Sequence, residues 1–184
     1  MTKLLSDIAE VCMGYTLRSS IEGFESGDLS VVRAKDITTK GEIDISQLPQ
    51  VAIRGFKGSA FVKEGDVLLS CRGSFRAAAC GKTEEGVVAS STVFIIRPKS
   101  SEILSEYLAV FLNSPQGQSR LGKLSSGGAM KSLIRRDVVH LEVDIPSLDI
   151  QQKIVDAYRI WVKLDSFLER KRDLYYNLSQ LLIS

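Results

Sequence analysis

The sequence predicts an α+β protein in which a globular domain with a β-sheet core, residues 1–148, is followed by a long helix over residues 149–184. Three observations support this fold class. Segments rich in β-branched residues gather before residue 98, apolar residues recur with the helical period after it, and neither Pro nor Gly occurs beyond Pro146. A chain of 184 residues has room for one domain and such an appendage.

The first half of the chain is predicted to consist of short elements joined by turns. Residues 3–12 carry apolar side chains on one helical face, which predicts a short helix that ends at Gly14. Gly65 and Asp66 are expected to form a turn with a structural role. Extended segments are predicted where β-branched or alternating apolar residues gather. They are a strand that runs into a turn at 29–37, a short piece at 43–45, two runs on either side of a turn at 64–66 within 60–70, and one buried strand at 87–97.

Helices are expected to dominate after residue 98. The stretch 102–113 has a continuous apolar face, and 116–124 adds a second helical segment. A short helix is expected to begin within 132–136, and 141–145 has the composition of a strand. The long helix should begin at Pro146–Asp149, because Pro fixes an extended entry and Ser147 or Asp149 can cap the first turn.

The final helix is predicted to be a coiled-coil strand about 50 Å long. Its apolar stripe is broken once, by Lys171 and Arg172. A compact domain has little use for such a stripe, so a partner helix is expected to cover it; packing against the chain's own domain is the alternative. The residues with three- and four-residue spacing that are expected to anchor the partner helix are Ile154, Tyr158, Trp161, Leu164, Leu168, Tyr175, Leu178 and Leu182.

The orientation of the helix pair is not fixed by the apolar pattern, which suits a parallel or an antiparallel arrangement. In an antiparallel pair, the basic residues Lys171 and Arg172 would face the acidic segment Asp149–Asp156 of the partner. If two helices pair, this complementarity favours an antiparallel coiled coil.

Composition places the chain among cytoplasmic globular proteins without metal. No apolar run approaches the length needed to cross a membrane, so no membrane partner is expected. The three cysteines lack CxxC spacing, and His140 is the only histidine. Zinc is not predicted, and a structural role is expected for His140.

Enzymatic motifs are missing as well. The sequence has neither a GxxxxGK[ST] phosphate loop nor a GxSxG nucleophile motif. We therefore expect a non-catalytic protein that uses no cofactor.

Basic residues are concentrated in two segments, although the net charge is only +2. Residues 54–82 hold six basic and two acidic side chains, and residues 120–136 hold five basic side chains and no acid. Such patches can hold a polyanion on one face, and solvated basic loops are the equally good alternative when the patches are considered alone.

Three loops combine basic residues with hydroxyl groups or glycines: KDITTK at 35–40, RGSFR at 72–76 and SSGGAMK at 125–131. Arg and Lys can reach the guanine edge, while Ser, Thr and backbone N–H groups bind phosphates. The expected DNA contacts are Arg33, Lys35, Thr38, Thr39, Lys40, Arg72, Ser74, Arg76, Lys82, Gly127, Gly128 and Lys131.

The order of these segments resembles the DNA-specificity (S) subunit of type I restriction-modification systems, in a half-sized form with one target-recognition domain and one coiled-coil helix. Each segment alone is modest, but their order and spacing are specific. The resemblance rests on LSDIAEVCMGYT, SVVRAKDITTKGEID, the V-x-x-G-D-V-L-L-S-x-x-G pattern at Val62–Gly73, ASSTVFIIRP, EYLAVFLNSPQGQ and SSGGAMKSLIRRDVVHLEVDIPSLDIQQKIV.

This resemblance implies a function and partners. S subunits of the family read double-stranded DNA without covalent chemistry, and they hold methyltransferase (M) subunits and, in the full complex, restriction (R) subunits. Two recognition domains separated by paired helices read a bipartite site. This sequence departs from that pattern with one domain and one helix, which implies either a homodimer or a piece of a longer subunit. The alternative is a regulatory adaptor that competes for methyltransferase subunits without reading DNA.

Overall fold

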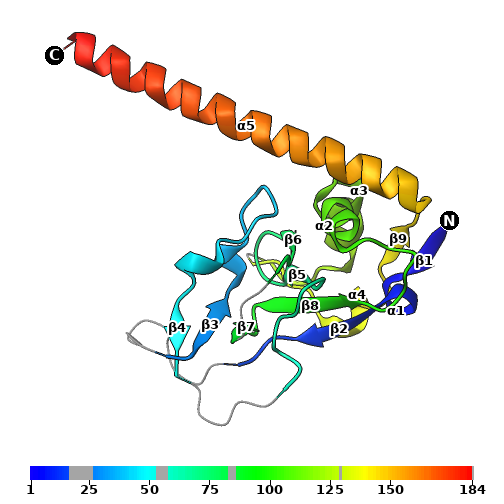
Figure 1. Ribbon diagram of the computed structural model, residues 1–184. Helices are drawn as coiled ribbons and strands as arrows, with labels where there is room; N and C mark the ends of the chain where they lie inside the picture. The colour runs from blue at the N-terminus through cyan, green and yellow to red at the C-terminus, as the bar shows by residue number, and fades with distance from the viewer. Residues whose placement is uncertain (17–26, 53–57, 83–85, 129, 184) are drawn as a thin grey trace.

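The computed structural model describes residues 1–16, 27–52, 58–82, 86–128 and 130–183, and side chains as far as residue 181. A β-sheet, a short helix and a long helix form successive layers (Figure 1). Helix α2 (Ser105–Asn113) lies on the sheet, and the first part of α5 (Leu148–Ile183) lies on α2. The predicted α+β class with a long C-terminal helix is therefore confirmed.

The central sheet is antiparallel, in the order β2 (Ala9–Met13), β8 (Val93–Pro98), β5 (Val67–Ser70) and β6 (Ala77–Ala79). Its two middle strands are buried on both faces. Because successive side chains of a strand point to opposite faces, Leu69 enters the core under α2, while Leu68 enters a second core on the other face.

Two smaller sheets complete the β structure. One has the order β4 (Gln50–Val51), β3 (Leu29–Val32) and β7 (Val87–Ala89), and it covers the second face of the central sheet. Its β3 and β7 run parallel. The other pairs β1 (Thr2–Leu4) with β9 (Glu142–Asp144), which joins the N-terminus to the segment that leads into α5.

The prediction of one strand over 87–97 is wrong. The segment divides into β7 and β8, which belong to different sheets, with a turn at Ser90–Thr92 between them. The hydroxyl groups of Ser90 and Thr92 hydrogen-bond to each other (2.8 Å), and Val93 N donates to the Ser90 carbonyl (2.9 Å). These local bonds offer the backbone an alternative to the sheet ladder.

Two further predictions need correction. The helix predicted over 3–12 is helical only at α1 (Leu5–Ile8), because the residues before and after it pair with β9 and β8. The extended piece predicted at 43–45 is followed at once by a 3₁₀ turn, Ile45–Gln47, whose first turn is capped by the Asp44 carboxylate accepting from Ser46 N (3.0 Å). Long-range strand pairing and a local cap override the sequence periodicity.

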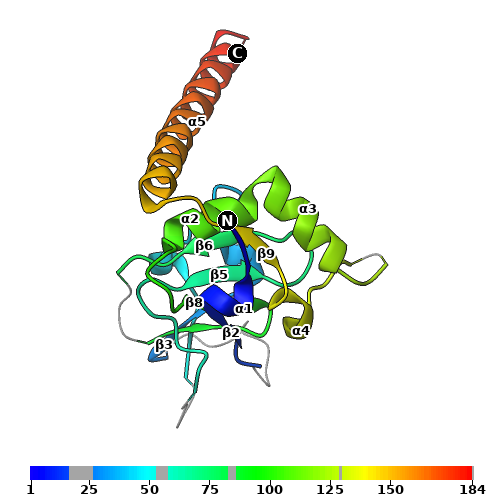
Figure 2. The ribbon, with the colours of Figure 1, turned by 90° about the vertical axis from the view of Figure 1, so that its right-hand side faces the viewer.

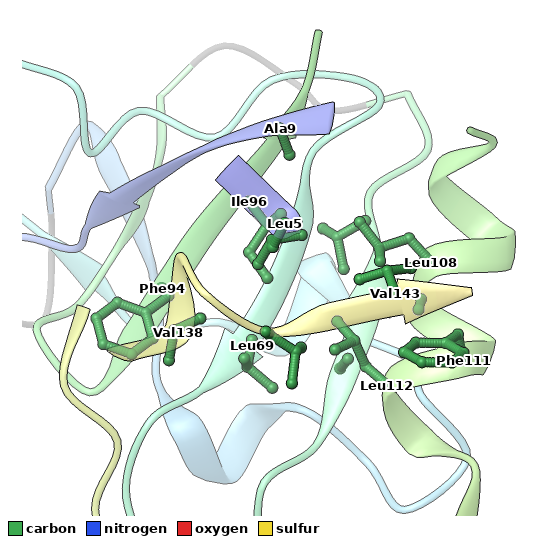
Figure 3. Packing of buried hydrophobic residues seen from close by; sticks show 14 of the residues in the cluster. Leu5, Ala9, Leu69, Phe94, Ile96, Leu108, Phe111, Leu112, Val138 and Val143 are labelled. Carbon is green, nitrogen blue, oxygen red and sulfur yellow. The ribbon is translucent and has the colours of Figure 1, made fainter. Parts of the chain in front are cut away.

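The main core lies between the central sheet and the helices that cover it. Helices α2, α3 (Pro115–Leu124) and α4 (Arg135–Val138) correspond to the segments predicted as helical. Figure 3 shows apolar side chains from the central sheet, from the helices and from β9 meeting in this core. Those labelled there are Leu5, Ala9, Leu69, Phe94, Ile96, Leu108, Phe111, Leu112, Val138 and Val143.

The turn at Gly65–Asp66 has the structural role that was predicted. Gly65 has a φ of +83°, a conformation that favours glycine. The carboxylate of Asp66, 1% exposed, accepts two hydrogen bonds from the Arg97 guanidinium, both 2.8 Å, and one from Lys63 N (2.8 Å). This bidentate pair fastens the start of β5 to the end of β8.

The first turns of α5 pack into the globular domain, beyond the predicted boundary at Asp149. Gln151 is 0% exposed, and its amide accepts from Leu104 N (2.9 Å) and donates to the Glu102 carbonyl (2.7 Å). Val155 and Val162 are buried on the same helical face. This face is adjacent to the predicted coiled-coil stripe and leaves that stripe largely uncovered.

The second half of α5 projects away from the domain (Figures 1 and 2). Every described side chain from Ser166 to Leu181 is exposed. In the described part of the chain, no helix combines the length and the hydrophobicity that crossing a bilayer requires.

Candidate nucleic-acid interface

Two loops that are distant in sequence lie side by side at one end of the central sheet. The first, Arg72–Arg76, joins β5 to β6, and the second, Ser126–Ser132, joins α3 to α4. Gly73 N donates a hydrogen bond to the Lys131 carbonyl (2.9 Å), and an isolated β-bridge pairs Arg72 with Ser132. Both loops were predicted to contact DNA, and the structure brings them together.

The turn at Ser90–Thr92 joins the same surface. Cys71 N donates to the Thr92 carbonyl (2.9 Å), and Ala34 N donates to the Thr92 hydroxyl (3.1 Å). The second bond ties the 3₁₀ turn Ala34–Asp36 to this end of the sheet. We call the segments 33–36, 72–76, 90–92 and 126–132 (without residue 129) the loop surface.

The exposed groups of the loop surface are cationic or small, apart from Met130, which is 65% exposed. Arg72, Ser74 and Lys131 are exposed, as is Lys35. An Arg guanidinium offers a planar fork of donors to a base edge or a phosphate, and Lys offers a mobile positive charge. Hydroxyl groups between them can bind phosphate oxygens.

Glycines shape the second loop. Gly127 has a φ of +109°, and a Cβ there would lie 2.4 Å from the Met130 carbonyl oxygen. Gly128 is exposed, with nothing near its missing Cβ. The loop therefore needs glycine at residue 127 and leaves its backbone open at residue 128, which permits the close approach of a phosphate.

A hollow of about 350 Å³ lies between the two loops. Arg72 and Arg135 provide its charge, and Ser91 provides a hydroxyl group. Cys71 contributes to the lining, and burial raises the pKa of its thiol, so it stays protonated. The hollow therefore combines hydrogen-bond donors with an apolar lining that includes Met13 and Leu133.

Two predicted cations have partners within the protein. Arg33 forms a bidentate pair with Asp36, at 2.8 and 2.9 Å. Arg76 is half-buried and donates to the Ile37 carbonyl (3.3 Å). Both side chains hold the loop surface in shape, and both remain at its border.

The other predicted contacts lie elsewhere. Lys82 is exposed beyond the far end of β6, next to Cys80, whose N donates to the Asp66 carbonyl (2.8 Å). Residues 38–42 form a tight turn in which Thr38 N donates to the Glu42 carbonyl (2.9 Å). That turn reaches α5, where Lys40 forms ion pairs, and Thr39 is exposed on it.

Two residues of the hollow were not among the predicted DNA contacts. Ser91 and Arg135 line the hollow, and Arg135 lies in the acid-free segment 120–136 that had been noted only for its charge. His140, expected to be structural, is exposed just after α4. Among the described residues no group of three or more His, Cys, Asp or Glu could hold a metal ion.

The predicted coiled-coil stripe is mostly exposed. Trp161, Leu164 and Leu168 are between 49% and 54% exposed, and Tyr175 and Leu178 are 64% and 54% exposed. The side chain of Leu182 lies outside the described residues. The stripe is therefore free to meet a partner along the projecting half of α5.

The start of the stripe is partly used by the domain. Ile154 is 36% exposed, and Tyr158 is half-buried, with its hydroxyl donating to the Lys40 carbonyl (3.3 Å). A second exposed apolar column that the sequence reasoning missed runs beside the stripe at seven-residue intervals, at Ile160, Phe167, Leu174 and Leu181.

Taken together, these features define a recognition module: a rigid sheet presents a cationic, hydroxyl-rich loop surface, and a projecting helix offers an apolar face. The chain belongs to the type I restriction modification DNA specificity domain family, whose sequence profile matches residues 1–172. The family resemblance found in the sequence is thereby confirmed. Specificity subunits are the non-catalytic components of restriction-modification complexes.

Individual relatives agree with this assignment. The chain is 26% identical over 174 residues to the type I restriction enzyme MjaIX specificity subunit of Methanocaldococcus jannaschii, covering 92% of this chain and 39% of that protein. It is 27% identical over 130 residues to the type I restriction enzyme EcoBI specificity subunit of Escherichia coli, covering 69% of this chain and 27% of that protein.

Solved structures show the same fold. A chain from a structure described as the basis of complex assembly and conformational transition of the type I R-M system superposes with a TM-score of 0.68 and 19% identity. The match covers 98% of this chain and 43% of that one. This chain thus spans about two fifths of the length of that protein.

Proposed function

We propose that this chain reads one half of a bipartite site in double-stranded DNA through its loop surface. The observation that carries the proposal is the joining of the loops at 72–76 and 126–132 into one exposed cationic surface on a rigid sheet. Membership in a DNA specificity family supports it.

Within this surface we assign Arg72 to base reading and the second loop to phosphate binding. Arg72 is exposed while its backbone is held by the bridge to Ser132, so its guanidinium projects from a fixed point. Lys131 and the open backbone at Gly128 suit a phosphate. Ser74, Lys35 and Arg33 supply further contacts at the border of the surface.

We further propose that α5 pairs with the same helix of a second copy as an antiparallel coiled coil. The uncovered stripe on its projecting half supports this. The homodimer would carry two recognition domains, and its two-fold symmetry would require a palindromic site with an unread spacer. The paired helices would also hold methyltransferase subunits and, in the full complex, restriction subunits.

A selection from a random double-stranded DNA library, with the purified chain and its methyltransferase subunit, tests the proposal. The expected result is one bipartite motif with a fixed spacer. Arg72→Ala should relax the preference at one base position by roughly 1–3 kcal/mol, and Glu64→Gln, an exposed change away from the loop surface, should not. A library without any enriched motif would contradict DNA reading.

The second candidate function is the regulatory adaptor, because the exposed face of α5 alone suffices for competition with a specificity subunit. In that case the Arg72→Ala chain would still displace a full-length specificity subunit from the methyltransferase, and the library would show no motif.

A further inference from the structure

The turn at residues 38–42 forms a polar brace between the recognition domain and α5. The ammonium group of Lys40 contacts the Asp165 carboxylate (2.9 Å), the Glu169 carboxylate (2.6 Å) and the Ser166 hydroxyl (3.2 Å). Its side chain is only 15% exposed. In Figure 1 the loop after β3 rises toward α5, well away from the start of that helix.

The brace is anchored on the domain side as well. Gly41 has a φ of +65°, and a Cβ there would lie 2.8 Å from the Ala77 carbonyl oxygen and 2.9 Å from the Asn113 amide nitrogen. Asn113 in turn exchanges two hydrogen bonds with the Ala77 backbone, at 2.9 and 2.7 Å. The turn therefore rests on β6 and on the end of α2.

The apolar contact between α5 and the domain ends near this point. A groove of about 250 Å³ separates the turn, α2 and α5, with Val155 and Val162 in its lining. Val162 is the last buried residue of the helix among those described. Asp165 and Glu169 lie beyond it, so among the described residues the brace is the outermost contact between helix and domain.

A small change in the angle of α5 at this position would move the far end of the helix by several ångströms. From Val162 to Ile183 the helix extends about 32 Å at ~1.5 Å per residue. A pivot of about 10° at Val162 would move the far end by about 5–6 Å. That displacement exceeds the rise of one base pair, ~3.4 Å.

We propose that Lys40 is a positioning residue that fixes the spacer length of the DNA site by holding α5 at one angle to the recognition domain. This inference rests on the proposed function, since it concerns the distance between two recognition domains joined through α5. On this proposal Lys40 sets the spacing of the half-sites and is not a DNA contact.

The test uses the full chain with its methyltransferase subunit and a DNA library in which the spacer between the enriched half-sites varies by single base pairs. Wild type should select one spacer. In Lys40→Ala and in the double variant Asp165→Asn/Glu169→Gln, the affinity for neighbouring spacers divided by the affinity for the preferred spacer should rise at least tenfold over the wild-type ratio. The half-site sequences should stay unchanged. Lys40→Arg should restore selectivity, because it keeps the charge.

The acidic double variant separates the brace from a DNA contact, since loss of two carboxylates cannot remove a phosphate contact. If Lys40 contacted DNA, Lys40→Ala would weaken all spacers equally and reduce the log–log salt slope by ~0.9, and the acidic variant would keep its selectivity. That result would overturn the proposal. The matched control is Asp173→Asn, whose carboxylate pairs with Arg172 on the same helix (3.6 Å).

A second readout needs no DNA. Spin-labelled non-canonical residues at positions 101 and 177, both exposed, should give a narrow distance distribution in wild type and a broader one in Lys40→Ala. An equally narrow distribution in both would refute the brace. A broadened distribution with no DNA motif selected by wild type would refute the proposed function and leave the brace as a structural element.

Discussion

Replacing Asp66 with Asn should destabilise the domain by about 2–3 kcal/mol. In the wild type the Arg97 guanidinium donates two hydrogen bonds of 2.8 Å to the Asp66 carboxylate. Asn keeps the shape of the side chain, but it removes the charge and turns an N–H₂ group toward the guanidinium. Breaking a buried ion pair costs roughly 3–5 kcal/mol. Because Arg97 is 25% exposed, water can replace part of what it loses, which lowers the expected value.

Urea unfolding followed by far-UV circular dichroism measures this loss, and the unfolding temperature should fall by about 5–10 °C. A double-mutant cycle with Arg97→Leu should give a coupling free energy of about 1 kcal/mol or more, because the two side chains contact each other directly. Glu64→Gln, in the same turn but exposed, is the matched control and should change stability by less than about 0.5 kcal/mol. If Asp66→Asn unfolds at the urea concentration of wild type, the turn does not depend on the pair.

Two further predictions concern the second loop and the strand pair at the N-terminus. Gly127→Ala should lower DNA affinity at least tenfold in a binding titration while the unfolding temperature stays near that of wild type, because the added Cβ distorts an exposed loop at a φ of +109°. The hydrogen bond from the Thr2 hydroxyl, with help from Arg120, lowers the pKa of the Asp144 carboxyl. A carboxyl whose pKa is lowered by folding stabilises the folded state at pH values above its ordinary pKa of ~3.9. This stabilisation is lost as the pH falls through the pKa of the folded state. Thr2→Val should therefore flatten the fall in unfolding free energy between pH 5 and pH 2, and an unchanged profile would contradict the role of that bond.

The parts of the fold that sequence predicted well are those where one signal dominates. The apolar face of α2 and the long apolar stripe of α5 have no competing partner in the local sequence, so periodicity fixes their secondary structure. The segment 3–12 has a helical pattern too, but two of its three parts gain more hydrogen bonds by pairing with β9 and β8. Nothing local in those residues records the distant partner strand.

The candidate site shows the same division. Composition was enough to propose the loops at 72–76 and 125–131, because Arg, Ser and Gly in a loop are suited to phosphate and base contacts. Their adjacency depends on the bond from Gly73 N to the Lys131 carbonyl, which joins residues 58 positions apart. Lys40 was chosen because it is a basic residue in a loop with hydroxyl groups, and that pattern does not distinguish a lysine that faces DNA from one that faces two carboxylates.

The loop surface and the brace both rest on β6 and the residues next to it, but their exposed groups are different. The segment between them is fastened to the β6 region at both ends: Arg76 donates to the Ile37 carbonyl at one end, and Gly41 rests against the Ala77 carbonyl at the other. A rigid strand therefore holds both features in a fixed relation. Arg72, by contrast, projects from that foundation without sharing a partner with Lys40. Neither a substitution in the loops nor one in the brace disturbs the strand that carries both features. Substitutions of exposed loop residues can therefore change the bases that are read while the spacing stays the same. Substitutions in the brace can change the spacing while the bases stay the same.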